Sequence, residues 1–426
     1  MQTDCFPDAV TDWPKGPISD LAAVNPRYPI VKGREYPFVE MASVGENFAG
    51  ILQFEARMLE GSGLSRFKAG DTLFAKITPC PENGKIAFVA SLSDDVGLGS
   101  TEFIVLSPKS GAIPRFVYHL ACTHAVRGRA AARMEGSTGR QRVPEEVFSK
   151  RLLVPLPGPD EQATIVRTLD SVDMALESTR AAVERAREVK RALVQRVFSK
   201  GLRGEPTKKT AIGYLPRSWQ VVQVSSVVAT FQYGLSVPME AKGNLPILRM
   251  GNIQDGEVLL SDLKFVSLPP KATDPYMLRR GDVLFNRTNS QEWVGKIGIY
   301  RHDAPAVFAS YLIRLVSDSS KIDNYYLGQV LESYSSQCRI KRYATPGVQQ
   351  VNINATNLGK VLIPVPMGDD TLREQREIAD VLEAADALVR SYKPVLAAQQ
   401  ELKSSVAHDL LTGRVRARET AKAVAS

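Results

Sequence analysis

The 426-residue sequence predicts an α+β fold in which two similar sheet-containing domains alternate with two long helices. We expect the helices to pack as an antiparallel coiled coil and the whole chain to have a pseudo-two-fold arrangement. Three observations lead to this prediction. Sequence motifs occur twice, each copy holds short β-type runs separated by Gly, Pro and Asp, and a heptad pattern follows each copy.

The internal repeat is clearest in a Gly-Asp-x-Leu-Phe segment, which begins at Gly70 and again at Gly281. A Gly-Lys-Ile segment follows each copy, at 84–86 and at 295–297. Further matches are Val154-Pro155-Leu156-Pro157 with Ile363-Pro364-Val365-Pro366, and Glu161-Gln162 with Glu374-Gln375. A duplicated fold presents two related surfaces, so we expect a partner with two related sites, and double-stranded DNA is the leading candidate.

The β-type runs predict a sheet-rich α+β module in each copy, over about 13–155 and 212–364. The first module contains the runs 37–41, 85–89 and 103–106, and the second contains 246–250, 296–300 and 312–315.

The helical pattern behind each module has the alternating four- and three-residue steps of a coiled-coil seam. Seam positions of the two helices correspond at an offset of 213, and even a polar intrusion repeats, since Lys190 falls on Lys403. Buried polar groups can specify alignment, so we expect a fixed register. The principal seam residues are Ile165, Leu169, Val172, Leu176 and Lys190 in the first helix and Ile378, Leu382, Val389, Leu396 and Lys403 in the second.

Local signals mark the ends and one irregularity of these helices. Gly201 and Gly413 are predicted C-caps. Pro394 has no counterpart in the first helix and predicts a local kink in the second.

Composition narrows the class of protein. The net charge of +8 and pI of about 9.2 favour a polyanionic partner. No apolar stretch approaches the ~18 residues that a membrane span needs, and the first residues do not resemble a secretion signal. The four cysteines show no paired spacing, which indicates reduced thiols. We therefore expect a cytoplasmic protein that does not contact a membrane.

Catalytic motifs are not recognisable. No phosphate-binding loop occurs, and Asn25-Pro26-Arg27-Tyr28 only approximates a methyltransferase motif. His119 and His124 have no carboxylate or thiol cluster near them in the sequence, so we expect them to be structural and predict no metal site. Asp71 and Asp282 are interpreted as residues of Gly-Asp turns rather than metal ligands. The chain is thus predicted to be non-catalytic and to hold no cofactor itself.

Two groups of residues are candidates for DNA contact, because Lys and Arg bind phosphates while Arg, Asn and Gln read base edges. The first group consists of matched pairs, Lys76 with Arg287, Thr78 with Asn289, and Lys85 with Lys296. The alternative is a solvated strand edge. The second group comprises Arg140, Gln141, Arg142, Gln349 and Gln350. The alternative is that these side chains brace a turn against the helices.

The combination of motifs resembles the specificity subunit of type I restriction-modification systems. The resemblance rests on the Gly-Asp-x-Leu-Phe, Thr/Pro-Gly-x-Gln and Pro-x-Pro…Glu-Gln segments in duplicated order, and on Gly213-Tyr214-Leu215-Pro216 followed by Trp219. It covers essentially the whole chain. It implies a first target-recognition domain over 1–157, a spacer helix over 158–203, a second recognition domain over 204–368, a second spacer helix over 369–416 and a tail over 417–426.

The resemblance also implies how such a chain works. Each recognition domain would bind one half of an asymmetric bipartite DNA sequence, and the spacer would dock two modification (methyltransferase) subunits. Restriction subunits would complete the complex, with S-adenosylmethionine, ATP and Mg on the partner subunits. The main alternative is a stand-alone DNA-binding regulator, and a more remote one is a methyltransferase with diverged motifs.

Overall fold

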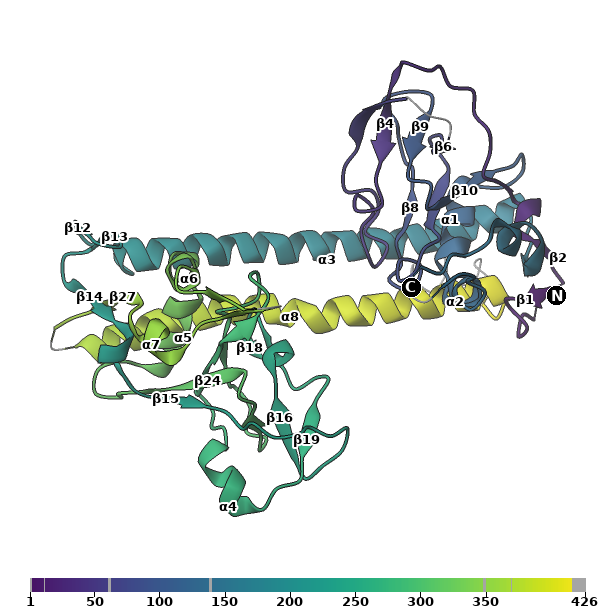
Figure 1. Ribbon diagram of the computed structural model, residues 1–426. Coiled ribbons are helices and arrows are strands. Elements are labelled where there is room, and N and C mark those ends of the chain that lie inside the picture. Colours follow the sequence, from purple (N-terminus) through teal and green to yellow (C-terminus); the bar gives the residue numbers. More distant parts are fainter. Residues whose placement is uncertain are drawn as a thin grey trace, which may run out of the picture. The chain divides into compact units, whose positions relative to one another are not determined.

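The chain divides into two units, and each of two long helices contributes to both. The computed structural model describes residues 2–10, 12–59, 63–137, 140–347, 350–368 and 370–415. The first unit comprises Met1–Ala181 with Lys393–Ser426, and the second comprises Ala182–Tyr392. Helix α3 (Pro159–Lys200) and helix α8 (Thr371–Thr412) therefore each place one half in either unit (Figure 1). No helix in the described part of the chain is long and apolar enough to span a membrane.

Three sheets form the described β-structure of the first unit. The central antiparallel sheet has the order β3 (Ala22–Val24), β10 (Phe103–Pro108), β7 (Thr72–Ala75), β8 (Ile86–Phe88). A second sheet, in which β4 is parallel to β9, has the order β5 (Glu55–Met58), β4 (Glu35–Val39), β9 (Gly97–Gly99), β6 (Ser65–Phe67). The third has the order β1 (Thr3–Asp4), β11 (Leu152–Pro155), β2 (Lys15–Pro17).

The second unit contains a larger central sheet. Its order is β15 (Val228–Tyr233), β24 (Leu312–Ser317), β20 (Val283–Asn286), β22 (Ile297–Ile299), β18 (Gly256–Val258), β17 (Ile253–Gln254). A second sheet, in which β16 is parallel to β23, has the order β19 (Lys264–Val266), β16 (Leu245–Leu248), β23 (Val307–Phe308). The smaller sheets join β21 (Thr288–Asn289), β26 (Val351–Asn352) and β25 (Thr345–Pro346), then β14 (Trp219–Gln223) with β27 (Leu362–Pro366), and β12 (Thr207–Thr210) with β13 (Gly213–Pro216).

The internal repeat extends to sheet topology. The order β3-β10-β7-β8 in the first unit matches β15-β24-β20-β22 in the second. The parallel pair β4 and β9 likewise matches β16 and β23. All six predicted β-type runs overlap the strands β4, β8, β10, β16, β22 and β24, which confirms the prediction of two similar sheet-containing modules.

Two short helices follow the central sheet in each unit. They are α1 (Pro114–Cys122) and α2 (His124–Ala131) in the first, and α5 (Asn324–Glu332) and α6 (Tyr334–Lys341) in the second. Side-chain hydroxyls cap the second helix of each pair, since Thr123 accepts from Val126 N and Ser333 accepts from Ser336 N. The remaining elements are α4 (Pro270–Thr273), α7 (Ala355–Gly359), the π-helical turn η2 (Val147–Arg151) and the 3₁₀ turns η1 (Ile18–Asp20), η3 (Val224–Ser226), η4 (Met250–Asn252) and η5 (Asp274–Tyr276).

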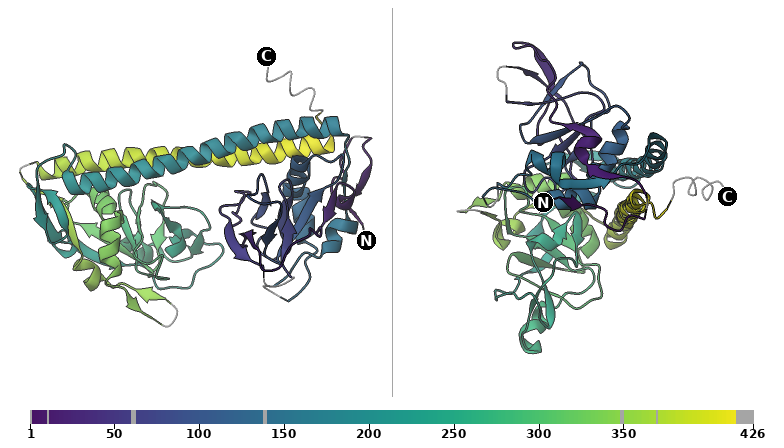
Figure 2. Two further views of the ribbon diagram at one scale, coloured as in Figure 1. Left: turned by 90° about the horizontal axis from the view of Figure 1, so that it is seen from above. Right: turned by 90° about the vertical axis from the view of Figure 1, so that its right-hand side faces the viewer.

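In each unit the long helices close the hydrophobic core, and they run antiparallel there (Figures 1 and 2). The first core joins Phe74 and Phe116 to Leu169 of α3 and Leu410 of α8. The second joins Phe285 and Tyr326 of the module to Phe198 of α3 and to Ile378 and Leu382 of α8. The apolar stripe of each helix therefore serves two purposes, since it pairs the helices and covers a sheet.

The predicted seam residues differ in how far they are buried. Ile165, Leu169, Leu176, Ile378 and Leu382 are buried, whereas Val172, Lys190, Val389, Leu396 and Lys403 are half-buried. Beyond the helices, Gly201 and Gly413 adopt positive φ (67° and 70°), as expected of residues that follow a helix C-terminus. Helix α8 is continuous through Pro394.

The Glu-Gln motifs anchor the long helices to the modules. In the first unit, Gln162 Oε1 accepts from Ile113 N (2.8 Å) just before α1. In the second, Gln375 Oε1 accepts from Asp323 N (2.8 Å) just before α5. Both glutamines are buried, so the repeated motif fixes the start of an equivalent helix in each unit.

Candidate nucleic-acid interface

In the first unit, three loop segments meet where strand β7 ends. Lys76 N donates to Glu102 O (2.9 Å), and Val143 N donates to Lys76 O (2.9 Å). Thr78 N donates to Gln141 O (3.0 Å). The two groups of residues predicted from sequence to contact DNA are thus brought side by side.

The second unit repeats this backbone arrangement where strand β20 ends. Arg287 N donates to Tyr311 O (3.0 Å), and Ile353 N donates to Arg287 O (2.9 Å). Strands β21 and β26 then pair, with Asn289 opposite Val351. We call the two equivalent places loop site 1 (Lys76–Thr78, Glu102 and Arg140–Arg142) and loop site 2 (Arg287–Asn289, Tyr311 and Gln350–Asn352).

A bidentate ion pair dominates loop site 1. The Arg142 guanidinium donates to both Glu102 carboxylate oxygens, at 2.7 Å from Nη2 to Oε1 and 2.8 Å from Nε to Oε2. These hydrogen bonds lower the pKa of Glu102, and nearby Lys76 also lowers it. Arg140 and Gln141 are exposed, and Thr78 donates to Glu82 Oε1 (3.1 Å). The site therefore presents donors and one ionised acceptor to solvent.

Loop site 2 has a different character. The Arg287 guanidinium lies over the Tyr233 ring, 5.0 Å from its centroid, and Nη1 donates to Ser310 O (3.3 Å). Tyr311 occupies the position equivalent to Glu102 and is 36% exposed. Asn289 Oδ1 accepts from Ser290 N (2.8 Å), and Gln350 is exposed. The predicted contact Gln349 lies outside the described residues.

One predicted lysine follows strand β7 or β20 at each site, Lys85 in the first unit and Lys296 in the second, and both make intramolecular contacts. Lys85 Nζ donates to Met41 O (3.2 Å). Lys296 Nζ lies 3.4 Å from the centroid of the Trp293 ring, and burial lowers the pKa of this lysine. Their backbones remain close to the sites, since Ala75 N donates to Lys85 O (3.1 Å) and Asn286 N to Lys296 O (2.8 Å).

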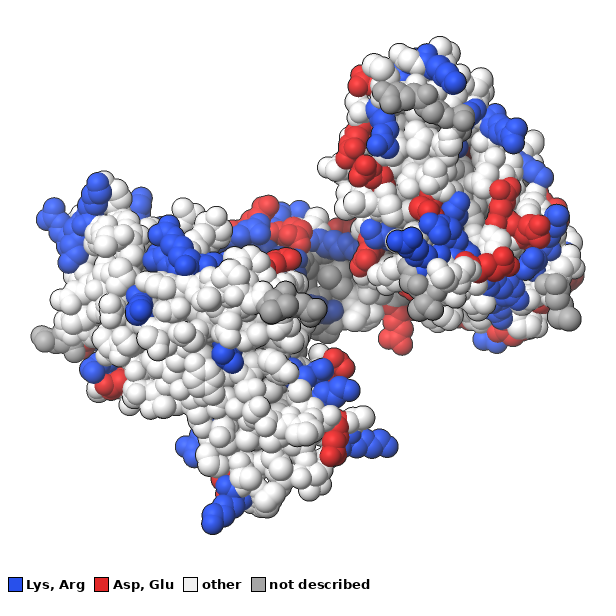
Figure 3. Space-filling view, in the orientation of Figure 1, with Lys and Arg blue, Asp and Glu red and all other residues white. Residues whose placement is uncertain are grey.

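Sequence reasoning missed Glu102, Tyr233, Tyr311 and Trp293 as members of these sites. A signal existed for two of them, because Glu102 and Tyr311 each immediately precede a predicted strand of the repeat. Exposed aromatic rings beside basic groups are suited to nucleic-acid contact. Figure 3 shows that Lys and Arg side chains are spread over both units with Asp and Glu among them, so charge alone does not mark the sites in this view.

The structure brings two carboxylates to His119, which the sequence did not indicate. Among the described residues, His119, Asp170 and Asp173 form the one group with metal-binding spacing, with one ligand atom of each within 4.8 Å of the others. Cations already pair with these carboxylates, since Arg115 Nη2 lies 2.5 Å from Asp170 Oδ1 and Lys403 Nζ lies 2.5 Å from Asp173 Oδ1. We interpret the group as an ion-pair network rather than a metal site.

This network gives the first unit a titratable buried group. Burial lowers the pKa of the His119 imidazole, whose Nε2 lies 2.7 Å from Asp170 Oδ1. Burial by itself raises the pKa of Asp170, but hydrogen bonds from His119 and Arg115 outweigh it and lower that pKa to about 2.

We expect His119→Gln to reduce the loss of stability of the first unit between pH 7 and pH 5. Unfolded His119 takes up a proton below about pH 6.5 while the folded state resists it, so stability falls by at most about 1.4 kcal/mol per pH unit there. Glutamine is the residue at the equivalent position, Gln329. The measurement is the pH dependence of thermal unfolding, with exposed His124→Gln as control. An unchanged dependence in His119→Gln would contradict the assignment.

Comparison with known proteins finds similar proteins over part of the chain. Residues 216–396 match the type I restriction modification DNA specificity domain. The chain is 29% identical over 211 residues to a putative type I restriction enzyme specificity subunit, MjaX, of Methanocaldococcus jannaschii, covering 49% of each. It is 26% identical over 289 residues to the MjaVIII specificity subunit of the same organism, covering 66% of this chain and 65% of the relative. The match thus spans between half and two thirds of these relatives.

Solved structures share the fold. A chain from a study of complex assembly and conformational transition of the type I R-M system superposes with a TM-score of 0.54 at 19% identity, covering 96% of this chain and 99% of that one. The type I S subunit from M. genitalium gives the same TM-score at 15% identity, covering 94% and 96%. Residues 216–396 thus match the type I restriction modification DNA specificity domain, and the chain is similar over about half to two thirds of its length to type I restriction enzyme specificity subunits.

Proposed function

We propose that this chain selects the DNA target of a type I restriction-modification complex and that loop sites 1 and 2 each read one half of an asymmetric bipartite sequence. The observation that carries the proposal is the repeated backbone arrangement at Lys76 and Arg287, which presents different side chains in the two units. The recognition domains would be 1–157 and 204–368, joined by spacer helices over 158–203 and 369–416. The chain itself is the non-catalytic component.

The chemistry of the two sites favours different base pairs. Loop site 1 pairs an acceptor, Glu102, with the donors Arg142 and Gln141, and a carboxylate can accept from the cytosine amino group. Loop site 2 has no carboxylate at the equivalent position, and Arg287 lies there on an aromatic ring. Arginine suits guanine, and exposed rings suit stacking or methyl contact. Two unlike sites on one chain would read an asymmetric target.

The outer face of α8 supports docking of the modification subunits on the spacer helices. Val381 and Leu388 in the second unit, and Val395 and Leu402 in the first, are exposed and recur at seven-residue spacing. The equivalent α3 positions are Thr168, Ala175, Ala182 and Val189. An exposed apolar heptad position is the feature expected of a helix that receives a partner helix. We propose that two modification subunits bind the spacer, that restriction subunits join them, and that these partners carry S-adenosylmethionine, ATP and Mg.

We expect Leu388→Glu to weaken co-purification with modification subunits by at least about tenfold, because a charge would enter a desolvated apolar contact. Pull-down with a tagged chain measures it. Ala387→Glu is the matched control, since Ala387 is also exposed on α8 but lies beside the stripe. Equal binding by both variants and the wild type would place the docking surface elsewhere.

The experiment that tests the function is reconstitution. We expect the purified chain alone to transfer no methyl groups, and the chain with its modification subunits to methylate one bipartite sequence, mapped by sequencing of modified bases. Activity of the chain alone would instead favour a diverged methyltransferase. Sequence-specific DNA binding without association with any modification subunit would favour the stand-alone regulator.

A further inference from the structure

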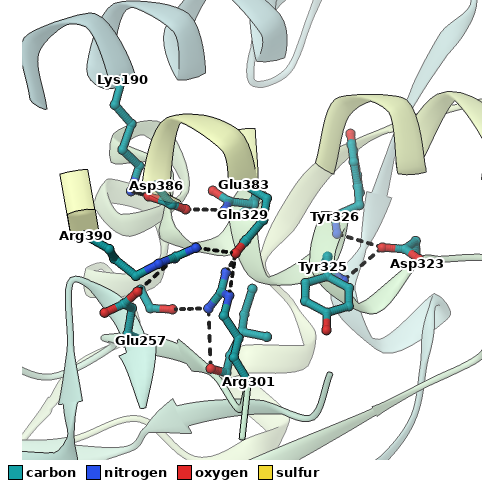
Figure 4. A network of polar contacts seen from close by, with 12 residues as sticks. Lys190, Glu257, Arg301, Asp323, Tyr325, Tyr326, Gln329, Glu383, Asp386 and Arg390 are labelled. Carbon is teal, nitrogen blue, oxygen red and sulfur yellow. Dashed lines mark hydrogen bonds and ion pairs between the residues drawn. The ribbon is translucent and has the colours of Figure 1, made fainter. Parts of the chain in front are cut away.

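In the second unit, one buried carboxylate joins the module to both long helices. Asp386 of α8 is 9% exposed. Its Oδ1 lies 2.5 Å from Lys190 Nζ of α3, and its Oδ2 accepts from Gln329 Nε2 of α5 at 2.6 Å. Figure 4 shows Lys190 of α3 and Gln329 of α5 converging on Asp386. The three side chains thus connect three elements at one point.

A second carboxylate extends this network toward the sheet. Glu383 lies on α8 one turn before Asp386 and forms a two-pronged ion pair with Arg301, which follows β22. Arg390 Nη2 donates to Glu383 Oε1 at 2.7 Å, and its Nη1 donates to Glu257 Oε1 of β18 at 2.8 Å (Figure 4). The central sheet is therefore tied to α8 through charged side chains as well as through the core.

The first unit has an equivalent network built from partly different residues. Asp173 and Asp170 of α3 correspond to Asp386 and Glu383 of α8 at the same offset, and Lys403 corresponds to Lys190. Lys403 Nζ lies 2.5 Å from Asp173 Oδ1. His119 of α1, at the position of Gln329, lies 2.7 Å from Asp170 Oδ1 through Nε2, and its Nδ1 lies 3.9 Å from Asp173 Oδ2. Each lysine of the predicted seam thus pairs with a carboxylate of the opposite helix.

Charge pairs of this kind define the alignment of the helices more than they add to the free energy of unfolding. The side chains of the two lysines and their aspartates are only 12–19% exposed, so desolvation offsets much of their attraction. Apolar seam residues tolerate small shifts of one helix along another, whereas a half-buried lysine separated from its carboxylate would be left unpaired. A slip of the module or of either helix is therefore penalised in both units.

We infer that the Lys190–Asp386–Gln329 and Lys403–Asp173–His119 groups, which we call the positioning hubs, fix the register and tilt of each recognition module on the helix pair. This inference rests on the proposed function, because the consequence is a fixed gap between the two half-sites. The hub residues touch no DNA. They act through the modules, so they are positioning residues for target selection.

The test uses the reconstituted complex of the full-length chain with its modification subunits, acting on a DNA library in which the gap between half-sites varies. Lys190→Met and Lys403→Met each remove a charge with little change in side-chain length. Each is expected to lower the preference for the native gap over gaps one base pair longer or shorter by about tenfold, roughly the discrimination carried by one mismatched pair. Arg187→Met, which breaks the exposed Arg187–Glu184 pair on α3, is the matched control and should keep the native preference.

A charge exchange separates positioning from stability. Lys190→Asp combined with Asp386→Lys restores an ion pair in the opposite sense and is expected to regain most of the gap preference that Lys190→Asp alone loses. This exchange carries the test if Lys190→Met does not fold. A folded Lys190→Met complex with the native gap preference and only a lower Tm would overturn the inference. So would a folded exchange variant that regains stability without regaining the preference.

Failure of the proposed function looks different. A wild-type complex that methylates no defined sequence would contradict that function and would leave the hubs to be judged by hydrogen exchange on the chain alone. There, Lys190→Met should speed amide exchange in α5 and leave α1 unchanged, and Lys403→Met should do the reverse. Uniform exchange in either variant would overturn the hubs independently of DNA.

Discussion

Arg287→Ala is expected to lower methylation of the native target about 10- to 100-fold, with the loss confined to discrimination at one half-site, because a base contact by arginine contributes roughly 1–3 kcal/mol. The Arg287 side chain is already held in place by the Tyr233 ring and by Ser310 O. Its Nε is buried without a hydrogen-bond partner in the described structure, so truncation removes the ring contact and one hydrogen bond of 3.3 Å. The measurement is methylation of a library with each half-site randomised in turn.

The matched control for Arg287→Ala is Arg142→Ala in loop site 1. It should relax the half-site read by loop site 1 and leave the half-site read by loop site 2 intact. Arg142 differs in one respect, because its removal frees Glu102 from a bidentate ion pair. The freed carboxylate would repel phosphate, so we expect Arg142→Ala to weaken binding to target and random DNA alike. This loss would add to the relaxed half-site. If Arg287→Ala lowers methylation equally on target and random DNA, Arg287 is a phosphate contact.

Much of the fold could be predicted because the controlling patterns are local. Alternation and punctuation in runs such as 103–106 and 312–315 predicted strands β10 and β24. Heptad steps predicted the long helices, and the match of Lys190 with Lys403 predicted a polar position in the seam. The ionic partner of each lysine was not predicted, since Asp386 and Asp173 lie on the other helix and their approach depends on an antiparallel register that no local pattern encodes.

In the candidate sites, too, local patterns predicted some residues, whereas contacts between distant parts of the sequence were not predicted. Lys76 and Arg287 could be identified from the repeat, but their neighbours could not. Glu102 reaches Arg142 across 40 positions, and Tyr233 reaches Arg287 across a sheet whose strand order the sequence does not specify. The carboxylates beside His119 were not predicted for a similar reason, since no such cluster lies near it in the sequence. Asp170 and Asp173 are more than 50 positions away, and their three-residue spacing puts both on one face of α3.

Trp219→Ala is expected to destabilise the second unit by about 3–5 kcal/mol, the range for deleting a fully buried aromatic side chain. Trp219 is completely buried, lies edge-on to Tyr326 and belongs to the core that contains Phe198 and Ile378. Its Nε1 also donates to Glu374 Oε1 at 2.8 Å. Burial already raises the pKa of that carboxyl, so its ionised form would lose a donor in a poorly hydrated place.

The informative feature of Trp219→Ala is where the destabilisation occurs. Hydrogen exchange should accelerate in β14, β27 and α5 of the second unit, while the central sheet of the first unit, whose core contains neither Trp219 nor Glu374, keeps its protection. Tyr214→Ala is the matched control from the same motif, because Tyr214 is 62% exposed and its loss should change stability by less than about 0.5 kcal/mol. Equal acceleration in both units would mean that the chain unfolds as one cooperative body, and the two modules could then not respond separately to substitutions at their own half-sites.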